Sequence, residues 1–213
     1  MIKLSKSCIS IKEIKAVNKV LSKEYLGMGP EVKKFENDLN FFFKREVVCV
    51  SSGTAALQLA LQALGIKKGD EVLVPAITYV ATFQAISATG AKLIMCDIDK
   101  DNLIISIKDA KKKLTKKTKV IMPVFYAGNP GNIEEIYKFA KKNKIRVIED
   151  AAHAFGSVYK KKKIGSFGDI SCFSFDGIKN ITSGEGGCVV TDNKKNINTI
   201  KDLRLLGVSN DSA

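Results

Sequence analysis

Residues 47–64 read VVCVSSGTAALQLALQAL and contain three kinds of sequence in succession. Val47 to Val50 form a short apolar run, which is typical of a buried β-strand. Ser51 to Thr54 are small and mostly polar, and the pattern from Ala55 to Leu64 is that of a helix. A strand that passes through a glycine-containing turn into a helix is the repeating unit of α/β proteins.

The same alternation of strand and helix continues toward the C-terminus. Further strands are predicted at 72–74, 92–96, 120–124 and 146–148, and further helices at 80–87, 107–114 and 133–142. Two amphipathic helices are predicted ahead of residue 47, at 11–21 after a cap at Ser10 and at 31–43 after Gly29-Pro30. The sequence has no repeat or linker, so we expect one α/β domain with helices on both faces of a mostly parallel sheet.

The last part of the chain has a different texture. Two consecutive strands are predicted at 170–175 and 187–191, joined by a loop rich in glycine and polar residues. Loops of this kind are where chemistry is usually placed. After a further helix the chain runs through residues 202–209 without a closing element, and we expect a C-terminal part to be missing.

The composition is that of a soluble globular protein, with 213 residues of which 45% are hydrophobic. Residues 1–6 hold no apolar run, so we expect no secretory signal and a cytoplasmic location. The uncharged stretch 72–91 is long enough to span a membrane, but Pro75 and Gly90 favour a strand, a turn and a helix instead. Five dispersed cysteines without a CxxC spacing predict buried thiols rather than disulfides or a metal site.

The net charge of +13 raises the question of nucleic-acid binding. The lysines, however, recur in short runs at 111–113, 116–117, 141–142 and 160–163, which fall at predicted helix ends and turns. Such runs are typical of solvated surface, so we expect no dedicated nucleic-acid role and a positive field that helps to capture an anionic ligand.

Several common catalytic motifs are missing from the sequence. It contains no GxxxxGK[ST], no HExxH and no GxSxG, and it has a single histidine. Serine-hydrolase chemistry and multi-histidine metal sites are therefore disfavoured. Three other segments instead place reactive residue types at the C-terminal ends of predicted strands, the edge of an open α/β sheet where ligands bind.

The first segment is the turn at 51–55. Gly53 allows the backbone to approach a ligand, the N–H groups of the first helical turn attract an anion, and Thr54 adds a hydroxyl donor. The alternative is a purely structural helix cap by Ser52 or Thr54.

The second segment, Glu149 to His153, follows a buried strand directly. The carboxylate of Asp150 at such a strand end can hold the pyridine nitrogen of a cofactor protonated. The structural alternatives are a capping aspartate and, for His153, a hydrogen-bonded core histidine.

The third segment, residues 173–187, contains Lys179 in the loop between the last two predicted strands. A lysine that is held beside an aldehyde cofactor with little solvent can lose its proton and form an imine. The alternative for Lys179 is an ordinary surface lysine, which is the usual state of this residue type.

Taken together, these segments resemble the DegT/StrS family of PLP-dependent nucleotide-sugar aminotransferases (PLP, pyridoxal 5'-phosphate). The resemblance covers nearly the whole chain, with several motifs in the family's order. They are Gly27 to Glu36, SSGTAAL at 51–57, Gly69 to Val72 with Pro75 and Thr78, EDAAHA at 149–154, FSF at 173–175, Lys179-Asn180, and GEGG at 184–187.

The resemblance implies a fold and a set of site residues. It implies the large domain of the aspartate aminotransferase-like fold, fold type I of the PLP-dependent transferases, with a mixed sheet. Lys179 resembles the lysine that forms an imine with PLP, Asp150 the partner of the pyridine nitrogen, and His153 a residue near the phenolic oxygen. Tyr79 resembles an aromatic that stacks on the pyridine ring. The phosphate contacts are matched by Thr54, Ala55 and Ser174, next to Gly53.

The resemblance also implies a reaction and partners. We expect transamination of a keto sugar on a nucleotide diphosphate, with glutamate as the amino donor, in amino-sugar biosynthesis of a surface polysaccharide or glycoconjugate. Relatives form homodimers with shared active sites and continue into a smaller C-terminal domain, which we expect to be absent from residues 1–213. The alternatives are a PLP-dependent sugar dehydratase of the same family, which Lys179 argues against, and a non-catalytic truncated PLP-domain fragment.

Overall fold

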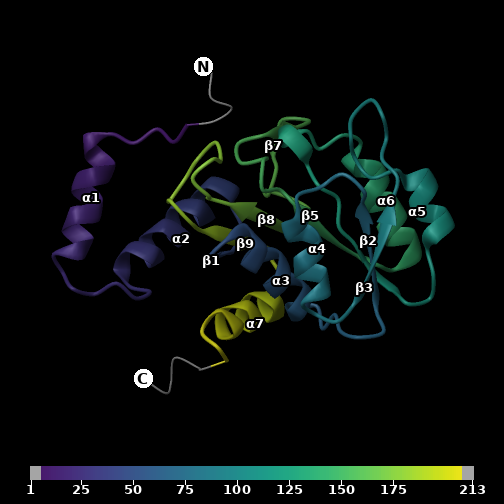
Figure 1. The fold of residues 1–213 in the computed structure, drawn as a ribbon, viewed down its shortest axis with the longest axis horizontal. Coiled ribbons are helices and arrows are strands. Elements are labelled where there is room, and N and C mark those ends of the chain that lie inside the picture. The colour runs from purple at the N-terminus through teal and green to yellow at the C-terminus, as the bar shows by residue number, and fades with distance from the viewer. Residues whose placement is uncertain (1–5, 208–213) are drawn as a thin grey trace.

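A seven-stranded sheet forms the centre of the computed structural model, which describes residues 6–207. The strands lie side by side in the order β1-β9-β8-β5-β4-β2-β3 (Figure 1). Their bounds are Val47–Val50 (β1), Gly187–Val190 (β9), Ile170–Ser174 (β8), Arg146–Asp150 (β5), Thr118–Ile121 (β4), Glu71–Pro75 (β2) and Lys92–Cys96 (β3). Within this sheet β9 is antiparallel to both neighbours and every other pair is parallel, so six strands point the same way.

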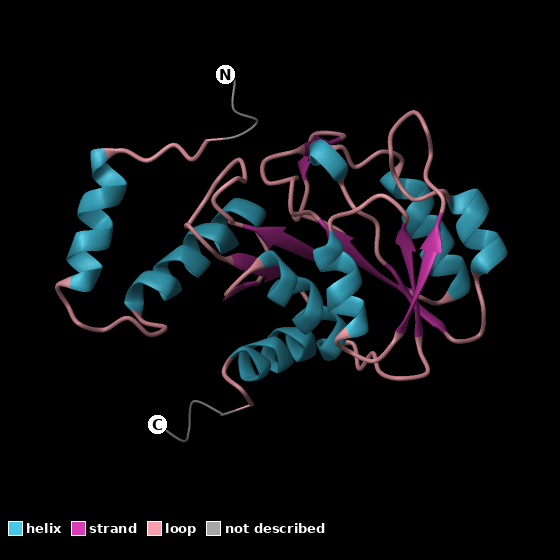
Figure 2. Ribbon diagram, viewed as in Figure 1, coloured by secondary structure: helices cyan, strands magenta, loops and turns pink. Residues whose placement is uncertain are grey.

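Helices cover both faces of the sheet, as Figure 2 shows. Their bounds are Ile11–Leu21 (α1), Pro30–Phe43 (α2), Gly53–Ala63 (α3), Val80–Ser87 (α4), Ile107–Lys113 (α5), Ile133–Asn143 (α6) and Lys194–Arg204 (α7), with a short 3₁₀ helix at Tyr126–Gly128. Apolar residues of α2, α5 and α6 belong to one buried cluster, and those of α3, α4 and α7 belong to a second. Strand side chains alternate between the two, Val147 in the first and Ile148 in the second. The predicted layers are therefore confirmed.

Helix α1 has the predicted bounds but packs differently from the other helices. Ser10 caps it, and a capping box with Glu13 satisfies donors of the first turn. None of its residues is buried, and its apolar side chains Ile11, Ile14 and Val17 face solvent. The helix stands away from the body of the molecule in Figure 1, so its local sequence rather than core packing determines it.

One predicted strand and one missed hairpin show where sequence reasoning was imprecise. The strand predicted at 120–124 is regular only to Ile121, because Pro123 has no N–H to donate to a ladder. The hairpin of β6 (Val158–Tyr159) and β7 (Lys162–Lys163) gave no sequence signal. Its two turn residues, Lys160 and Lys161, have positive φ angles of 45° and 67°. Turn positions with such angles are usually occupied by Asn and Gly.

The stretch 72–91 divides into β2 and α4. Within residues 6–207, no helix is both long and apolar enough to cross a membrane. Cys49, Cys96, Cys172 and Cys188 are buried free thiols, as predicted, whereas Cys8 is exposed because it lies in the segment before α1 and outside the core. Met1 to Ser5 of the expected signal-free start, and Val208 and Ser209 of the expected unclosed ending, lie outside the described residues.

Candidate active site

The predicted site residues gather at one edge of the sheet. Strands β1, β2, β5 and β8 point the same way, so their carboxyl ends meet at that edge. Asp150 ends β5 and Ser174 ends β8, while the turn at 51–54 follows β1. Segments that are far apart in the sequence are thereby brought together.

The turn after β1 is pressed tightly against β8 and β9. A Cβ atom on Gly53 would lie 2.8 Å from Ser174 Cβ and 3.2 Å from its hydroxyl oxygen, so only glycine fits. On the other side, a Cβ on Gly187 would lie 2.5 Å from the carbonyl oxygen of Ser52. The start of α3 and the Ser174 hydroxyl therefore lie side by side, an arrangement that suits an anion such as a phosphate group.

The turn also contains the helix cap that was the structural alternative to an anion site. Ser52 is the N-cap of α3, and its hydroxyl accepts a hydrogen bond from the Ala55 N–H at 3.1 Å. Ala55 therefore offers its N–H to an anion only in competition with this cap. The N–H groups of Gly53 and Thr54 precede the intrahelical ladder, and Gly53 packs directly against Ser174.

Asp150 is a buried carboxylate whose oxygens are held by neutral donors. Its side chain is 5% exposed. The Thr82 hydroxyl donates to Oδ2 at 2.7 Å, and the Ala152 N–H donates to Oδ1 at 3.2 Å. Burial raises the pKa of Asp150, whereas these two hydrogen bonds and the charges of His153 and Lys179 favour the ionised form. The carboxylate is thus fixed in orientation and aimed at a site that can hold a positive charge.

Thr82 is a site residue that sequence reasoning missed. It is fully buried on α4 and its hydroxyl also lies 2.6 Å from that of Thr78, so the two threonines form a relay that ends on Asp150. The signal was the spacing of two threonines by four residues, which places both on one side of a helix start. The partner, Asp150, lies 68 residues further on and left no trace in the local pattern.

Lys179 lies in the β8–β9 loop close to the two other predicted catalytic residues. Its backbone N–H donates to the Asp176 carbonyl at 3.0 Å, and its side chain is half-buried. The positive charge of Lys179 favours the ionised form of Asp150 and lowers the pKa of His153, although burial has the larger effect on both groups. Lys179 follows His153 by 26 residues and Asp150 by 29 in the sequence, and the catalytic roles of the three residues stay predictions.

His153 is held as a neutral ring. Partial desolvation, followed by the positive charge of Lys179, lowers its pKa, and Asp150 acts in the opposite direction. Nδ1 accepts a long hydrogen bond of 3.4 Å from the Ala127 N–H, which assigns the ring proton to Nε2. The ring meets Tyr126 edge to face with 5.8 Å between centroids, so His153 is oriented rather than packed in the core.

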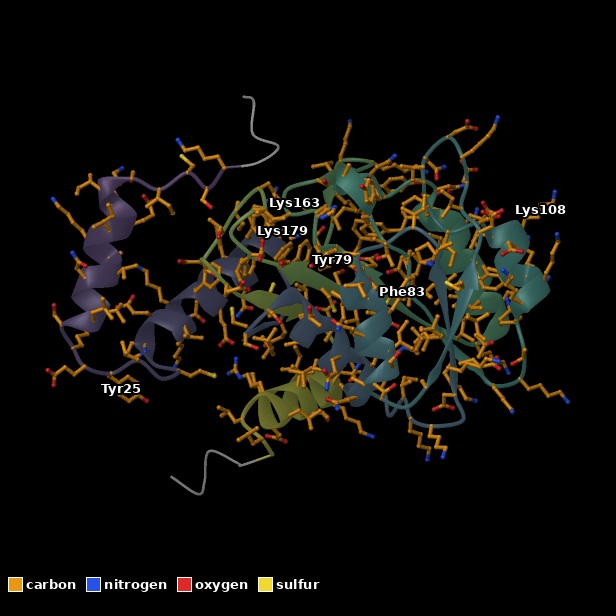
Figure 3. All side chains as sticks on the ribbon, viewed as in Figure 1. Tyr25, Tyr79, Phe83, Lys108, Lys163 and Lys179 are labelled. Atoms are coloured by element: carbon orange, nitrogen blue, oxygen red, sulfur yellow. The ribbon has the colours of Figure 1, made fainter. Side chains whose placement is uncertain are left out.

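Tyr79 lies at the rim of the same edge. It precedes α4 as its N-cap residue, one turn before Thr82, and its side chain is 74% exposed. Figure 3 labels Tyr79 and Lys179. A large aromatic ring that is left in solvent at this edge offers a flat apolar surface to a ligand.

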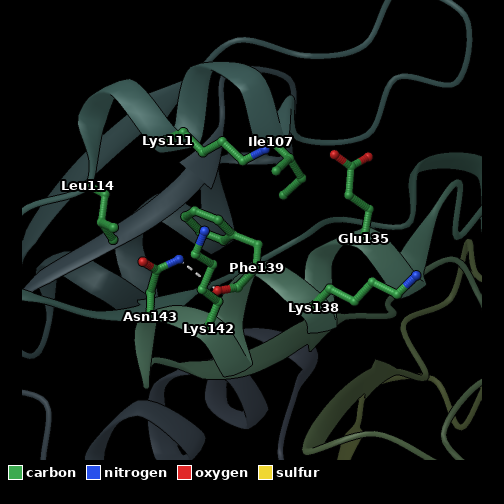
Figure 4. Close-up of a pocket in the computed structure, with 8 residues that line it drawn as sticks. All are labelled: Ile107, Lys111, Leu114, Glu135, Lys138, Phe139, Lys142 and Asn143. Carbon is green, nitrogen blue, oxygen red and sulfur yellow. Dashed lines mark hydrogen bonds between the residues drawn. The ribbon is translucent and has the colours of Figure 1, made fainter.

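Two surface grooves lie elsewhere and contain none of the predicted site residues. One, of about 340 Å³, runs between α5 and α6 over Ile107 and Phe139 with Lys111, Lys138 and Lys142 at its rim (Figure 4). The other, of about 410 Å³, lies between α6 and the β6–β7 hairpin.

The fold and these side chains together define a class of protein. The fold is that of PLP-dependent transferases of the aspartate aminotransferase-like class, to which the similar solved structures belong. The chain belongs to the DegT/DnrJ/EryC1/StrS aminotransferase family, whose model matches residues 7–213.

Individual relatives agree with this assignment. GDP-perosamine synthase of Escherichia coli O157:H7 is 49% identical over 187 residues, which are 86% of this chain and 51% of that protein. DesV of S. venezuelae, solved with a ketimine intermediate, superimposes with a TM-score of 0.91 at 33% identity over 95% of this chain and 55% of its own. NtdA of Bacillus subtilis, solved with bound PMP, gives 0.87 at 29% identity over 98% and 51%.

The chain spans about half the length of the curated relatives that it matches, 51% in the case of GDP-perosamine synthase. The elements that form the edge described above lie within this half.

Proposed function

We propose that this chain carries the cofactor-binding half of a PLP-dependent aminotransferase that acts on a keto sugar of a nucleoside diphosphate, with glutamate as the amino donor. The observation that supports the proposal is the position of Asp150 at the end of β5, next to the end of β8 and to the start of α3 that packs on Ser174, with Lys179 in the loop that follows β8. The family membership and the names of the relatives support the same chemistry.

The residues present fit PLP by their own chemistry. The turn at Gly53 and Thr54, together with the Ser174 hydroxyl, would bind its phosphate, with Ala55 contributing if Ser52 releases its N–H. Tyr79 would cover one face of the ring. When bound, PLP supplies an electron sink for reactions at an amine carbon.

The catalytic roles follow from the electrostatics of the edge. Asp150, aligned by Thr82, would keep the pyridine nitrogen protonated. The neutral ring of His153 would donate from Nε2 to the phenolic oxygen. Lys179 would hold the cofactor through its amine and then move a proton as acid and base.

The assembly and location are part of the proposal. A homodimer with a shared active site and a cytoplasmic location stay predictions from the sequence. The high positive charge of +13 would favour capture of the anionic nucleotide sugar from solution.

The test is a coupled assay of the full protein with PLP, glutamate and a panel of 3-keto and 4-keto nucleotide sugars. The proposal predicts glutamate-dependent amination of a member of the panel, with one 2-oxoglutarate formed for each amino group transferred. Release of a dehydrated sugar without consumption of glutamate would contradict it in favour of the dehydratase alternative. Absence of a near-visible PLP absorption band would contradict any PLP function.

A further inference from the structure

The outer edge of strand β1 is closed by two charged side chains from distant parts of the chain. β1 pairs with β9 on one side only. On its other side, the Cys49 N–H donates to Glu36 Oε1 of α2 at 2.9 Å, and the Cys49 carbonyl accepts from Arg204 Nη1 of α7 at 2.9 Å. The same Nη1 also donates to Glu36 Oε1. We call Glu36 and Arg204 the β1 clamp.

The clamp is unlike the surface ion pairs of the molecule. The side chains of Arg204 and Glu36 are 12% and 14% exposed, so their attraction is little screened by water. One further bond, from the Val47 N–H to Asn40 Oδ1 at 2.8 Å, occupies the next outward-facing donor of the strand. Edge strands are commonly left open or protected by short length and surface charge, whereas here specific acceptors and a donor fix one register.

Strand β1 leads directly into the predicted phosphate site. Ser51 separates its last residue, Val50, from the N-cap Ser52. On the inner side, Gly53 and Gly187 leave no room for adjustment, since an added Cβ would meet Ser174 or the Ser52 carbonyl within 2.8 Å. A shift of β1 by one residue moves the chain by about 3.4 Å, which would carry the first-turn N–H groups away from Ser174.

We propose that the β1 clamp is a positioning pair for the cofactor phosphate. Glu36 and Arg204 touch no ligand themselves, but by pinning the N–H and the carbonyl of Cys49 they hold Ser52, Gly53 and Thr54 against Ser174. The inference rests on the proposed function for the identity of the ligand. It also gives a role to Glu36, the last residue of the Gly27 to Glu36 motif, which the chemistry of the site did not use.

The test compares PLP with pyridoxal, which has the same ring and aldehyde but lacks the phosphate. Dissociation constants of both are measured by absorbance titration for the full protein and for the Glu36→Gln and Arg204→Met variants. Glu36→Gln keeps an acceptor for the Cys49 N–H and removes only the charge, so it is the milder change. We expect Arg204→Met to bind PLP about tenfold more weakly, the equivalent of one charge-assisted hydrogen bond, and Glu36→Gln to show a smaller loss, with pyridoxal affinity unchanged in both.

The matched control is Arg146→Met, which removes an ion pair with Asp169 whose side chains are 41% and 22% exposed. Arg146 begins β5, at the opposite end of the strand from Asp150. The variant should therefore be less stable than the parent protein, but its ratio of pyridoxal to PLP dissociation constants should equal that of the parent. In folded Glu36→Gln, a ratio of the pyridoxal to the PLP dissociation constant equal to that of the parent would overturn the positioning role. This holds whether both affinities are unchanged or both fall equally. If the parent protein itself forms no PLP adduct, the proposed function fails instead, and the two failures are thus distinguishable.

Discussion

Glu149 and Asp150 are neighbours on β5, and both carboxylates are buried, but they face different parts of the molecule. Glu149 is fully buried and accepts hydrogen bonds from the hydroxyls of Tyr137, at 2.7 Å, and of Ser171. Asp150 points to the opposite face, toward Thr82, His153 and Lys179. Burial alone therefore does not distinguish the proposed catalytic carboxylate from a structural one, and the difference lies in the charged side chains near Asp150.

The region around Glu149 is a closed network. Arg45, only 8% exposed, donates to the carbonyls of Gly165, Phe167, Gly168 and Asp169 and pairs with Asp192 at 2.8 Å. It holds the loop between β7 and β8 in place. The side chains of Glu149 and Arg45 both have fixed partners, which is typical of a structural site. The edge around Asp150 has an exposed aromatic, a half-buried lysine and a helix start instead, which is typical of a binding site.

The largest difference is expected between Asp150→Asn and Glu149→Gln. Asp150→Asn should lower kcat for amination by about 10² to 10³, because the pyridine nitrogen loses its counter-ion while the phosphate contacts remain. Glu149→Gln should change kcat by less than about threefold, because its neutral hydroxyl partners can hydrogen-bond to an amide as well as to a carboxyl group. Steady-state kinetics at saturating PLP decide between them. Similar kcat values for the two variants would remove the functional distinction between these carboxylates.

The structural side should respond in stability. Arg45→Met leaves four carbonyl groups and Asp192 without their donor, so the free energy of unfolding should fall by about 3 kcal/mol or more. Urea denaturation measures the loss. The ratio of pyridoxal to PLP affinity should be retained in the folded variant, and a change in that ratio would show that the two regions are coupled.

A pH series separates the two carboxylates further. Burial raises the pKa of Glu149 to about 7, against an ordinary value of 4.5. A raised pKa means that the folded state binds the proton more tightly than the unfolded state does. Stability from this group is therefore complete below pH 4.5 and decreases as the pH rises toward 7, by about 3 kcal/mol in total. The difference in unfolding free energy between the parent and Glu149→Gln should therefore change over that pH range. A difference that does not vary with pH would show that the proton is bound by another group.

The smallest stability effect is expected for Lys179→Ala. A loop lysine that is half-buried contributes little packing, so the apo protein should lose at most about 1 kcal/mol while amination is abolished. Thermal unfolding of the apo protein and the coupled assay give the two numbers. A large loss of stability would place Lys179 with the structural network instead of the site.

The sequence predicted the layers of the fold because each strand and helix carries its own periodicity, and it predicted Asp150 and Lys179 because they end or follow strands. Long-range polar contacts were not predictable in this way. Thr82 meets Asp150 across 68 residues, and Arg204 meets Cys49 across 155. Such pairs depend on how elements pack, which leaves no local pattern. The turn of Lys160 and Lys161 was missed for a different reason, since lysine is not a typical residue at positive φ.

The most direct test of the account is mass spectrometry of the full protein after incubation with PLP and reduction with borohydride. The account predicts a single pyridoxyl modification, on the peptide that contains Lys179, together with loss of the near-visible absorption band. The lysine content of the chain makes this a demanding result, since Lys163 and many other lysines are exposed and able to react. Modification of another lysine in preference to Lys179, with amination retained in Lys179→Ala, would contradict the assignment of the site.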